Sequence, residues 1–353
     1  MPPTEEPTDD PIGVADPATF GKEIVGTLLE NCTISQCSRV GGYFRGDQLV
    51  IRHCLVSDTS TEGIYVIGSS DCLLEKNIIA RNNVEQLTGY YPSAVKIFNQ
   101  TRRVTFRDNL VTDNPNSNGV WYDVGNVDGV FADNWIEGCL DGLFFEISKG
   151  VTVAGNVFLN CNNGIRILNS TRAQVYHNTF VNATASFERN ERSATGDHFA
   201  WHPETGPDVG ERDGHVFVGN LLVGDARSPR PLFRTWQSAV LKDRLTKPQL
   251  AQSDYNYYVR INAPARPLLS WSPVAGEKNE LEFARLDDFR ALFGSFEANS
   301  RVRDGGGAVF RSLELKHLEP VGVPAAASPL PAAIATLLGW PAEGARVPGA
   351  YQN

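Results

Sequence analysis

Short runs in which apolar and polar residues alternate recur along this chain. Residues 104–106, 151–153 and 164–167 are examples, and each run is bounded by Asn, Asp or Gly. Alternation with a period of two predicts β-strands, and the bounding residues are those that tolerate the left-handed backbone of tight turns. Helical patterns do not occupy the sequence between these runs. Consecutive strands are therefore not expected to form βαβ units.

A four-residue motif occurs eight times at nearly regular intervals, for example as DNLV at 108–111 and GNVF at 155–158. The second residues of the motif form a ladder with spacings of 22, 23, 32, 25, 22, 22 and 42 residues: Cys32, Cys54, Asn77, Asn109, Asn134, Asn156, Asn178 and Asn220. A second ladder lies five residues later: Cys37, Thr59, Asn82, Asn114, Cys139 and Cys161. Repeats of about 22 residues with several strands and no helix predict an all-β chain, a right-handed parallel β-helix of about eight or more coils.

Asparagine and cysteine occupy positions that this repeat explains. The chain has 25 asparagines, and 19 of them lie between Asn77 and Asn220. Like residues stack at the strand spacing of about 4.8 Å, so inward asparagines at a corner are expected to form a hydrogen-bonded stack. Five of the six cysteines lie in the ladders, and Cys72 aligns with two apolar positions, so all six are expected to fill the interior. The sequence leaves open whether Cys139 and Cys161, or Cys32 and Cys54, are bonded.

The composition divides the chain into three parts. Residues 1–25 are an acidic, proline-rich segment or cap, and residues 26–260 are the predicted β-helix. Residues 261–353 are expected to form an irregular extension packed on the last coils, with one helical segment at 286–293. Two insertions interrupt the β-helix, at about 83–92 and 189–213.

The third strand of each repeat indicates which side chains face away from the core. In the aligned segments 63–67, 94–98, 119–123, 142–146 and 164–168, the second and fourth residues are almost all apolar and should point inward. The third and fifth residues should then point outward, and they include Lys96, Trp121, Asp123, Phe144, Glu146 and Arg166. A sixth segment, 186–190, places Glu188 in the column of Lys96 and Arg166.

Asp123 and Glu146 lie 23 residues apart, one repeat, and so should stand side by side on adjacent coils. Like charges opposite each other in a sheet repel. The simpler interpretation is a solvated acidic patch that Lys96 and Arg166 balance. The alternative is a catalytic pair flanked by exposed aromatic side chains, because carboxyl groups about 5 Å apart are typical of retaining glycosidases. Repulsion would also raise the pKa of one carboxyl, as a proton donor requires.

The two insertions leave opposite ends of this sheet and are expected to wall a cleft over the pair. The first contains Tyr90 and Tyr91, and the second contains His198, Trp201 and His202. We expect nine residues to bind substrate, with aromatic rings stacked on sugar: Lys96, Trp121, Phe144, Arg166 and Glu188 of the outward column, and Tyr91, His198, Trp201 and His202 of the insertions. The alternative for the two histidines is that they only pack the loop.

The segments GVWYD (119–123), GLFFEIS (142–148) and VTVAGNVF (151–158) resemble the right-handed β-helix enzymes of glycoside hydrolase family 120. The likeness is good over residues 94–153 and extends over the β-helix, a pectate-lyase-like solenoid. That family contains β-xylosidases that act with retention. The resemblance implies that Asp123 is the nucleophile and Glu146 the acid/base. Family members are longer, with further N-terminal coils and an inserted β-sandwich at the substrate pocket.

Charge and hydropathy limit the classes of partner that this chain is expected to bind. With 41 acidic and 32 basic residues the net charge is −9, which argues against nucleic acid and anionic membrane surfaces as partners. No apolar run approaches the roughly 18 residues that span a bilayer. A signal peptide is not visible, so localisation stays open, and secretion or a periplasmic location would need a longer N-terminus. The first coil should need a cap, from a partner or from further N-terminal chain.

The sequence thus favours a glycosidase that acts on a neutral glycan or glycoside, such as a β-xyloside, without a cofactor or metal. Two alternatives remain. A polysaccharide lyase or epimerase of the same fold would use Lys96 or Arg166 as base or charge neutraliser, often with calcium. A non-catalytic glycan-binding solenoid would use the outward column only as a surface for stacking.

Overall fold

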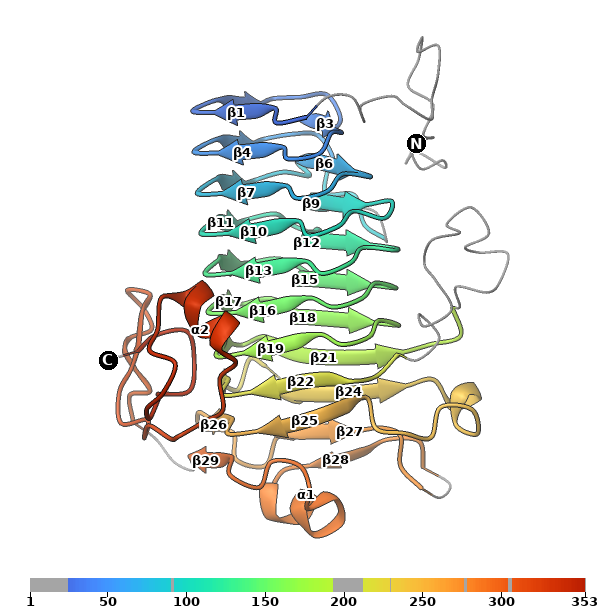
Figure 1. The fold of residues 1–353 in the computed structure, drawn as a ribbon. Helices are drawn as coiled ribbons and strands as arrows, with labels where there is room; N and C mark the ends of the chain where they lie inside the picture. Colours follow the sequence, from blue (N-terminus) through green and yellow to red (C-terminus); the bar gives the residue numbers. More distant parts are fainter. Residues whose placement is uncertain are drawn as a thin grey trace.

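The computed structural model describes residues 25–89, 92–192, 212–228, 230–275, 278–303 and 307–352. Over these residues the chain is a parallel β-helix, whose coils stack from the N-terminal to the C-terminal end (Figure 1). Each coil contributes one strand to each of three sheets. Tyr90, Tyr91, His198, Trp201 and His202 lie outside the described residues, so the predictions for them stay predictions.

The first sheet contains nine strands: β1 (Leu28–Glu30), β4 (Val50–Arg52), β7 (Leu73–Glu75), β10 (Thr105–Arg107), β13 (Val130–Ala132), β16 (Thr152–Ala154), β19 (Gln174–Tyr176), β22 (His215–Val218) and β25 (Leu250–Asp254). The second contains ten: β2 (Thr33–Ser35), β5 (Leu55–Ser57), β8 (Ile78–Ala80), β11 (Leu110–Thr112), β14 (Trp135–Glu137), β17 (Val157–Leu159), β20 (Thr179–Val181), β23 (Leu221–Gly224), β26 (Tyr257–Arg260) and β29 (Arg301–Arg303).

The third sheet also contains ten strands: β3 (Gly42–Phe44), β6 (Ile64–Ile67), β9 (Ser93–Phe98), β12 (Asn118–Asp123), β15 (Asp141–Glu146), β18 (Asn163–Leu168), β21 (Thr184–Arg189), β24 (Phe233–Gln237), β27 (Leu269–Trp271) and β28 (Leu281–Phe283). Neighbouring strands pair in parallel in all three sheets, except that β28 runs antiparallel to β27. Strands of six residues make this sheet the broadest, and it carries the outward column.

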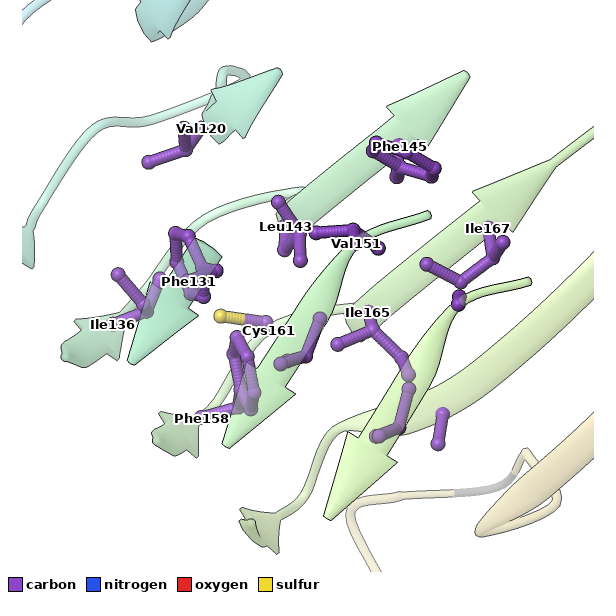
Figure 2. Packing of buried hydrophobic residues seen from close by; sticks show 14 of the residues in the cluster. Val120, Phe131, Ile136, Leu143, Phe145, Val151, Phe158, Cys161, Ile165 and Ile167 are labelled. Carbon is purple, nitrogen blue, oxygen red and sulfur yellow. The ribbon is translucent and has the colours of Figure 1, made fainter. Parts of the chain in front are cut away.

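The interior is a stack of apolar side chains from successive coils. Phe106, Phe131, Phe158 and Phe180 lie ring above ring, with centroids 5.4, 6.2 and 5.0 Å apart. The third sheet contributes the side chains predicted to point inward, including Val120, Leu143 and Ile165, and Figure 2 shows them among the buried side chains of neighbouring coils. All six cysteines are free, and Cys54, Cys72, Cys139 and Cys161 are buried in this interior as expected. The expectation is wrong for Cys32 and Cys37, which are only half-buried on the first described coil.

The asparagine stack is confirmed and continues one coil further than the sequence pattern reached. Each side-chain Nδ2 donates to the Oδ1 of the next member, over 2.9 to 3.2 Å, along Asn77, Asn109, Asn134, Asn156, Asn178, Asn220 and Asn256. The main-chain N–H of each of the first six donates to the same oxygen. The preceding residue often has a left-handed backbone, as in Asp108 and Asp133 (φ 55° and 54°). This turn directs the asparagine inward.

The stack ends on a buried carboxyl group. Asn256 donates to Glu297, which also accepts a hydrogen bond from Ser253 and is fully buried. Burial raises the pKa of Glu297 above its ordinary value, and hydrogen bonds from Ser253, Ser300 and Asn256 offset part of that rise. The last coil is thereby closed by a buried carboxyl group that takes up a proton more readily than an exposed one does.

The C-terminal region returns along the outside of the β-helix. Helix α1 (Leu286–Phe293), at the predicted position, packs beneath the last coils through Phe289. The hairpin β30 (Phe310–Ser312) and β31 (His317–Pro320) packs on β17, β20, β23 and β26, and α2 (Ala332–Leu338) packs near β16 and β19 (Figure 1). Within the described residues, neither helix is long and apolar enough to cross a membrane.

The asparagine stack should carry much of the stability. Replacing Asn134 by Ala removes the acceptor of two donors on Asn109 and the hydrogen bonds that Asn134 Nδ2 donates to the carbonyl of Phe106 and to Oδ1 of Asn156. We expect the free energy of unfolding in urea to fall by at least about 2 kcal/mol. The matched control is the exposed Asn162, whose change to Ala should cost less than about 0.5 kcal/mol. Equal losses in both variants would contradict a special role for the stack.

Glu297 should make stability fall as the pH rises. Because its pKa is raised in the folded protein, the folded state binds this proton more tightly than the unfolded state does. The resulting stabilisation is complete below the unfolded value of about 4.3 and is lost as the pH rises through the folded value. Glu297→Gln should therefore increase the free energy of unfolding at pH 7, and the gain should shrink at pH 4. Exposed Glu282→Gln is the control, and a Glu297→Gln protein less stable than the wild type at pH 7 would contradict the inference.

Candidate active site

The two carboxylates singled out by the repeat lie side by side at the ends of β12 and β15. Asp123 and Glu146 are direct partners in the strand register, as are Trp121 and Phe144 two pairs earlier. Lys96 on β9 pairs with Trp121, and Arg166 on β18 pairs with Phe144. The predicted column of outward side chains is thus correct for these six residues.

The column faces away from the core but is not solvated, which the sequence analysis did not expect. Glu146 is 0% exposed and Asp123 is 4% exposed, so the interpretation as a solvated acidic patch is wrong. The aromatic side chains, expected to be exposed, are covered as well, with Trp121 at 1% and Phe144 at 2%. The sequence pattern distinguishes inward from outward side chains, but it does not indicate what covers the outer face.

Each carboxylate has a cation of its own. Lys96 Nζ lies 3.1 Å from Asp123 Oδ2, and both side chains are almost completely buried. The same ammonium lies 4.3 Å from the centroid of the Trp121 ring and 4.8 Å from that of Phe98. Arg192, which follows β21, contacts Glu146 through Nη1 and Oε1. These two ion pairs compensate the repulsion that two adjacent buried carboxylates would otherwise produce.

The aromatic side chains form a layered stack beside the carboxylates. The rings of Trp121 and Phe144 lie 5.1 Å apart at an angle of 15°, and the guanidinium of Arg166 lies 4.8 Å from the Phe144 centroid. Together with Leu168, the two rings make a small apolar cluster separate from the main core. Buried apolar side chains therefore lie on one side of the two carboxylates. Contact of either ring with a sugar remains a prediction.

Glu188 lies in a different column from the one predicted. Its register partner is Leu168, so it lies in line with Asp123 and Glu146 across the strands. Ser186 takes the position beside Arg166 that was predicted for Glu188. The predicted alignment was therefore wrong by two residues. The register of β21 against β18 is irregular between Asn163 and Ile165, and Ala185 pairs with Ile165.

Arg166 connects Glu188 to a further carboxylate that the sequence analysis missed. Its Nε lies 3.1 Å from Glu188, and its Nη1 lies 3.5 Å from Asp141 at the start of β15. Burial raises the pKa of Asp141, and the charge of Arg166 and a hydrogen bond from Asn163 offset part of the rise. Arg166 is therefore held by two carboxylates at the edge of the site.

The backbone after both carboxylates is held in a conformation that suits neither residue. Val124 and Ile147 have φ values of 38° and 44°, a left-handed region that β-branched residues rarely adopt. Asn99 and Asn169 occupy the equivalent turns of the neighbouring coils at 59° and 50°. Next to the turns, Asn126 Nδ2 donates to the carbonyl of Asp123 (2.7 Å) and Ser148 Oγ donates to that of Glu146 (2.7 Å). Such local strain is a common feature of functional sites.

Several side chains of this face escaped the sequence analysis: Asp141, Arg192, Arg234, Trp236 and Glu280. Asp141 precedes the aligned segment, and Arg192 lies beyond the periodic strand. The last three belong to coils after the 42-residue spacing, where the alignment was not continued, although extending the repeat to 233–237 would have found Arg234 and Trp236. Among the described residues, His, Cys, Asp and Glu form no group that could hold a metal ion.

Comparisons with known proteins address the fold. A family model described as "Right handed beta helix region" matches residues 19–180. No curated protein matches the chain. Similar solved structures include XylC in complex with xylose, with 14% identity over 54% of this chain and 22% of that one and a TM-score of 0.32.

Two further structures are comparable. A double mutant of the periplasmic alginate epimerase AlgG shows 16% identity over 61% of this chain and 46% of that one, with a TM-score of 0.43. A mutant DFA-IIIase from Arthrobacter chlorophenolicus A6 with DFA-III shows 16% identity over 61% and 45%, with a TM-score of 0.37. The chain spans less than half the length of each of these three proteins. The family model describes the fold that the strand pairing shows, a right-handed β-helix.

The strain next to Asp123 can be tested through stability. Val124→Asn places at this turn the residue that two neighbouring coils use, and Asn tolerates the left-handed backbone. We expect the free energy of unfolding to rise by about 1 kcal/mol. The reciprocal control, Asn99→Val, should lower it by a similar amount. Loss of stability in both Val124→Asn and Val124→Gly would show that no strain is stored there.

Proposed function

We propose that the protein is a retaining glycoside hydrolase that acts on a neutral glycan or glycoside of the β-xyloside type. The observation that carries the proposal is the register pairing of Asp123 and Glu146, two carboxylates on adjacent strands of one face. A spacing of about 4.8 Å between strands matches the roughly 5 Å between carboxyl groups in retaining enzymes, whereas inverting pairs are wider. The resemblance to glycoside hydrolase family 120 assigns the same two residues.

Asp123 suits the role of nucleophile. A nucleophilic carboxylate must be ionised before it attacks the anomeric carbon. The ammonium of Lys96 lies 3.1 Å from Asp123 Oδ2, and both side chains are buried, so the carboxylate has a counter-ion and a fixed position. The ring of Trp121 holds the ammonium from another side. Lys96 is thus a positioning residue for Asp123.

Glu146 suits the role of acid and base once its own cation moves. The carboxyl lies next to Phe144 and Leu168, and dry apolar surroundings favour the protonated form that can donate to a leaving oxygen. Arg192 has the opposite effect, because its guanidinium favours the carboxylate. We therefore propose that Arg192 leaves Glu146 when the substrate binds. Glu146 then protonates the leaving group and later takes a proton from water.

The charges on this face favour a neutral substrate over a uronate. Its four described cations each contact at least one carboxylate: Lys96 contacts Asp123, Arg166 contacts Asp141 and Glu188, Arg192 contacts Glu146, and Arg234 contacts Glu188 and Glu280. Carboxylates outnumber cations by five to four in this set. A lyase or epimerase needs cations to neutralise a uronate carboxyl, and here such a substrate would meet repulsion instead.

The nucleophile can be identified by trapping. Incubation with an activated 2-deoxy-2-fluoro-β-xyloside should inactivate the enzyme and add one fluoroxylosyl group to the peptide that contains Asp123, as measured by mass spectrometry. Asp123→Asn should abolish both labelling and turnover. Because this variant leaves Lys96 buried without its anion, its folding is checked by circular dichroism.

Two controls accompany the labelling experiment: a variant of Glu146 and the anomeric configuration of the product. Glu146→Ala should still accept an aryl glycoside with a good leaving group, and added azide should restore turnover and give a β-glycosyl azide. NMR of the wild-type reaction should show the β-anomer first. Label on a residue other than Asp123, an inverted product, or ultraviolet absorbance from unsaturated uronates would contradict the proposal, and the last would favour a lyase.

A further inference from the structure

We propose that Trp236, with Arg234 and Glu280, forms a distal sugar-binding platform, so that the substrate is an oligosaccharide that extends from the carboxylate pair toward β24. This inference rests on the proposed function, because it names the chain length that the same site accepts. The contacts of Trp236 and the exposure of side chains along the third sheet carry it.

Trp236 lies in the same row as the two carboxylates. The row runs through register partners on five consecutive strands: Asp123, Glu146, Leu168, Glu188 and Trp236. Three strand spacings separate Glu146 from Trp236, or about 14 Å along the axis of the β-helix. A pyranose unit is about as long as one spacing. A sugar chain lying along the row would therefore place a ring near Trp236 a few units from the bond between the carboxylates.

The charged side chains on β18 and β24 are more exposed than those at the carboxylate pair. The side chains of Lys96 and Asp123 are 3% and 6% exposed, whereas those of Arg166 and Arg234 are 27% and 32% exposed. Trp236 is likewise partly exposed. In the other direction, the face is closed by aromatic side chains, since Tyr65 and Phe98 are buried edge to face with their rings 5.3 Å apart. The coil next to Asp123 on the β9 side is therefore covered, whereas the row reaches a partly exposed side chain at β24.

The platform has the chemistry of a sugar site. A large flat ring offers an apolar face to the C–H groups of a pyranose, and neighbouring charged groups bind its hydroxyls. The guanidinium of Arg234 lies 5.6 Å from the centroid of the Trp236 ring. Arg234 is held between Glu188 (3.7 Å) and Glu280 (3.2 Å), and Ser270 donates to Glu280 (2.7 Å). Donors and acceptors are therefore fixed beside the ring before a ligand arrives.

Trp236 also differs from the other aromatic residues on this face. Trp121 and Phe144 are stacked on each other and are almost completely covered. The apolar cluster that they form with Leu168 lies beside the carboxylates and does not extend to β24. Among the described aromatic residues from β12 to β24, the partly exposed ring of Trp236 is thus the outward one available to a distant sugar unit.

The test compares short and long substrates on Trp236→Ala, Trp236→Phe and a matched control. The control is Tyr43→Ala, which removes a half-exposed aromatic side chain from the opposite end of the same sheet. Isothermal titration with a panel of neutral β-linked disaccharides and hexasaccharides measures affinity, and hydrolysis of an aryl β-xyloside and of xylohexaose measures kcat/KM. Circular dichroism checks that each variant is folded.

We expect Trp236→Ala to bind hexasaccharide about tenfold more weakly, which is the size of one lost stacking contact. We also compare kcat/KM for xylohexaose with kcat/KM for the aryl glycoside. The ratio of the first to the second should fall by the same factor. Trp236→Phe should recover most of the loss, and Tyr43→Ala should not change the ratio. Equal losses on short and long ligands, or a wild type that binds hexasaccharides no better than disaccharides, would overturn the platform. A wild type that binds long chains through Trp236 but hydrolyses none would leave the platform standing and overturn the proposed function instead.

Discussion

The register between coils is the constraint on which the rest of the structure depends. In the asparagine stack each amide donates to the next coil and accepts from the previous one, and the same Oδ1 also takes a main-chain N–H. A shift of one residue in any coil would bury these polar groups without partners, at a cost of several hydrogen bonds. The stack therefore keeps equivalent residues of successive coils at equivalent positions. Asp123 stands beside Glu146 because Asn109 and Asn134 keep their two coils in register with the rest.

The burial of Asp123 and Glu146 is a second constraint on the site. Two adjacent carboxylates in dry surroundings are unfavourable unless each has a cation, and the third sheet supplies Lys96 on one side while Arg192 reaches in from beyond β21. The aromatic stack of Trp121 and Phe144 excludes water and so strengthens these charge interactions. The two pairs differ in a way that suits two chemical roles. The pair at Asp123 is enclosed, whereas Arg192 is partly exposed.

Sequence reasoning succeeded where the repeat was regular. The two ladders, the inward residues of the third strand and the pairing of Asp123 with Glu146 all follow from a period of 22 to 23 residues. It failed where the period broke. Glu188 was placed two residues out of register because β21 begins after an irregularity, and Trp236 was missed because a long spacing precedes its coil. Arg192 carries no periodic signal, since its position depends on where the chain turns after the strand.

The sequence by itself determined the fold, the stacking order of the coils and the face on which each strand residue lies. These follow from local alternation and from identical residues that satisfy one another across coils, which are properties of short segments repeated along the chain. Only the tertiary structure decided which outward residues are covered, which cation pairs with which carboxylate, and where the face opens toward β24. Those features depend on contacts between side chains that are far apart in the sequence. The residues of one repeat do not indicate which side chains from other parts of the chain will cover it.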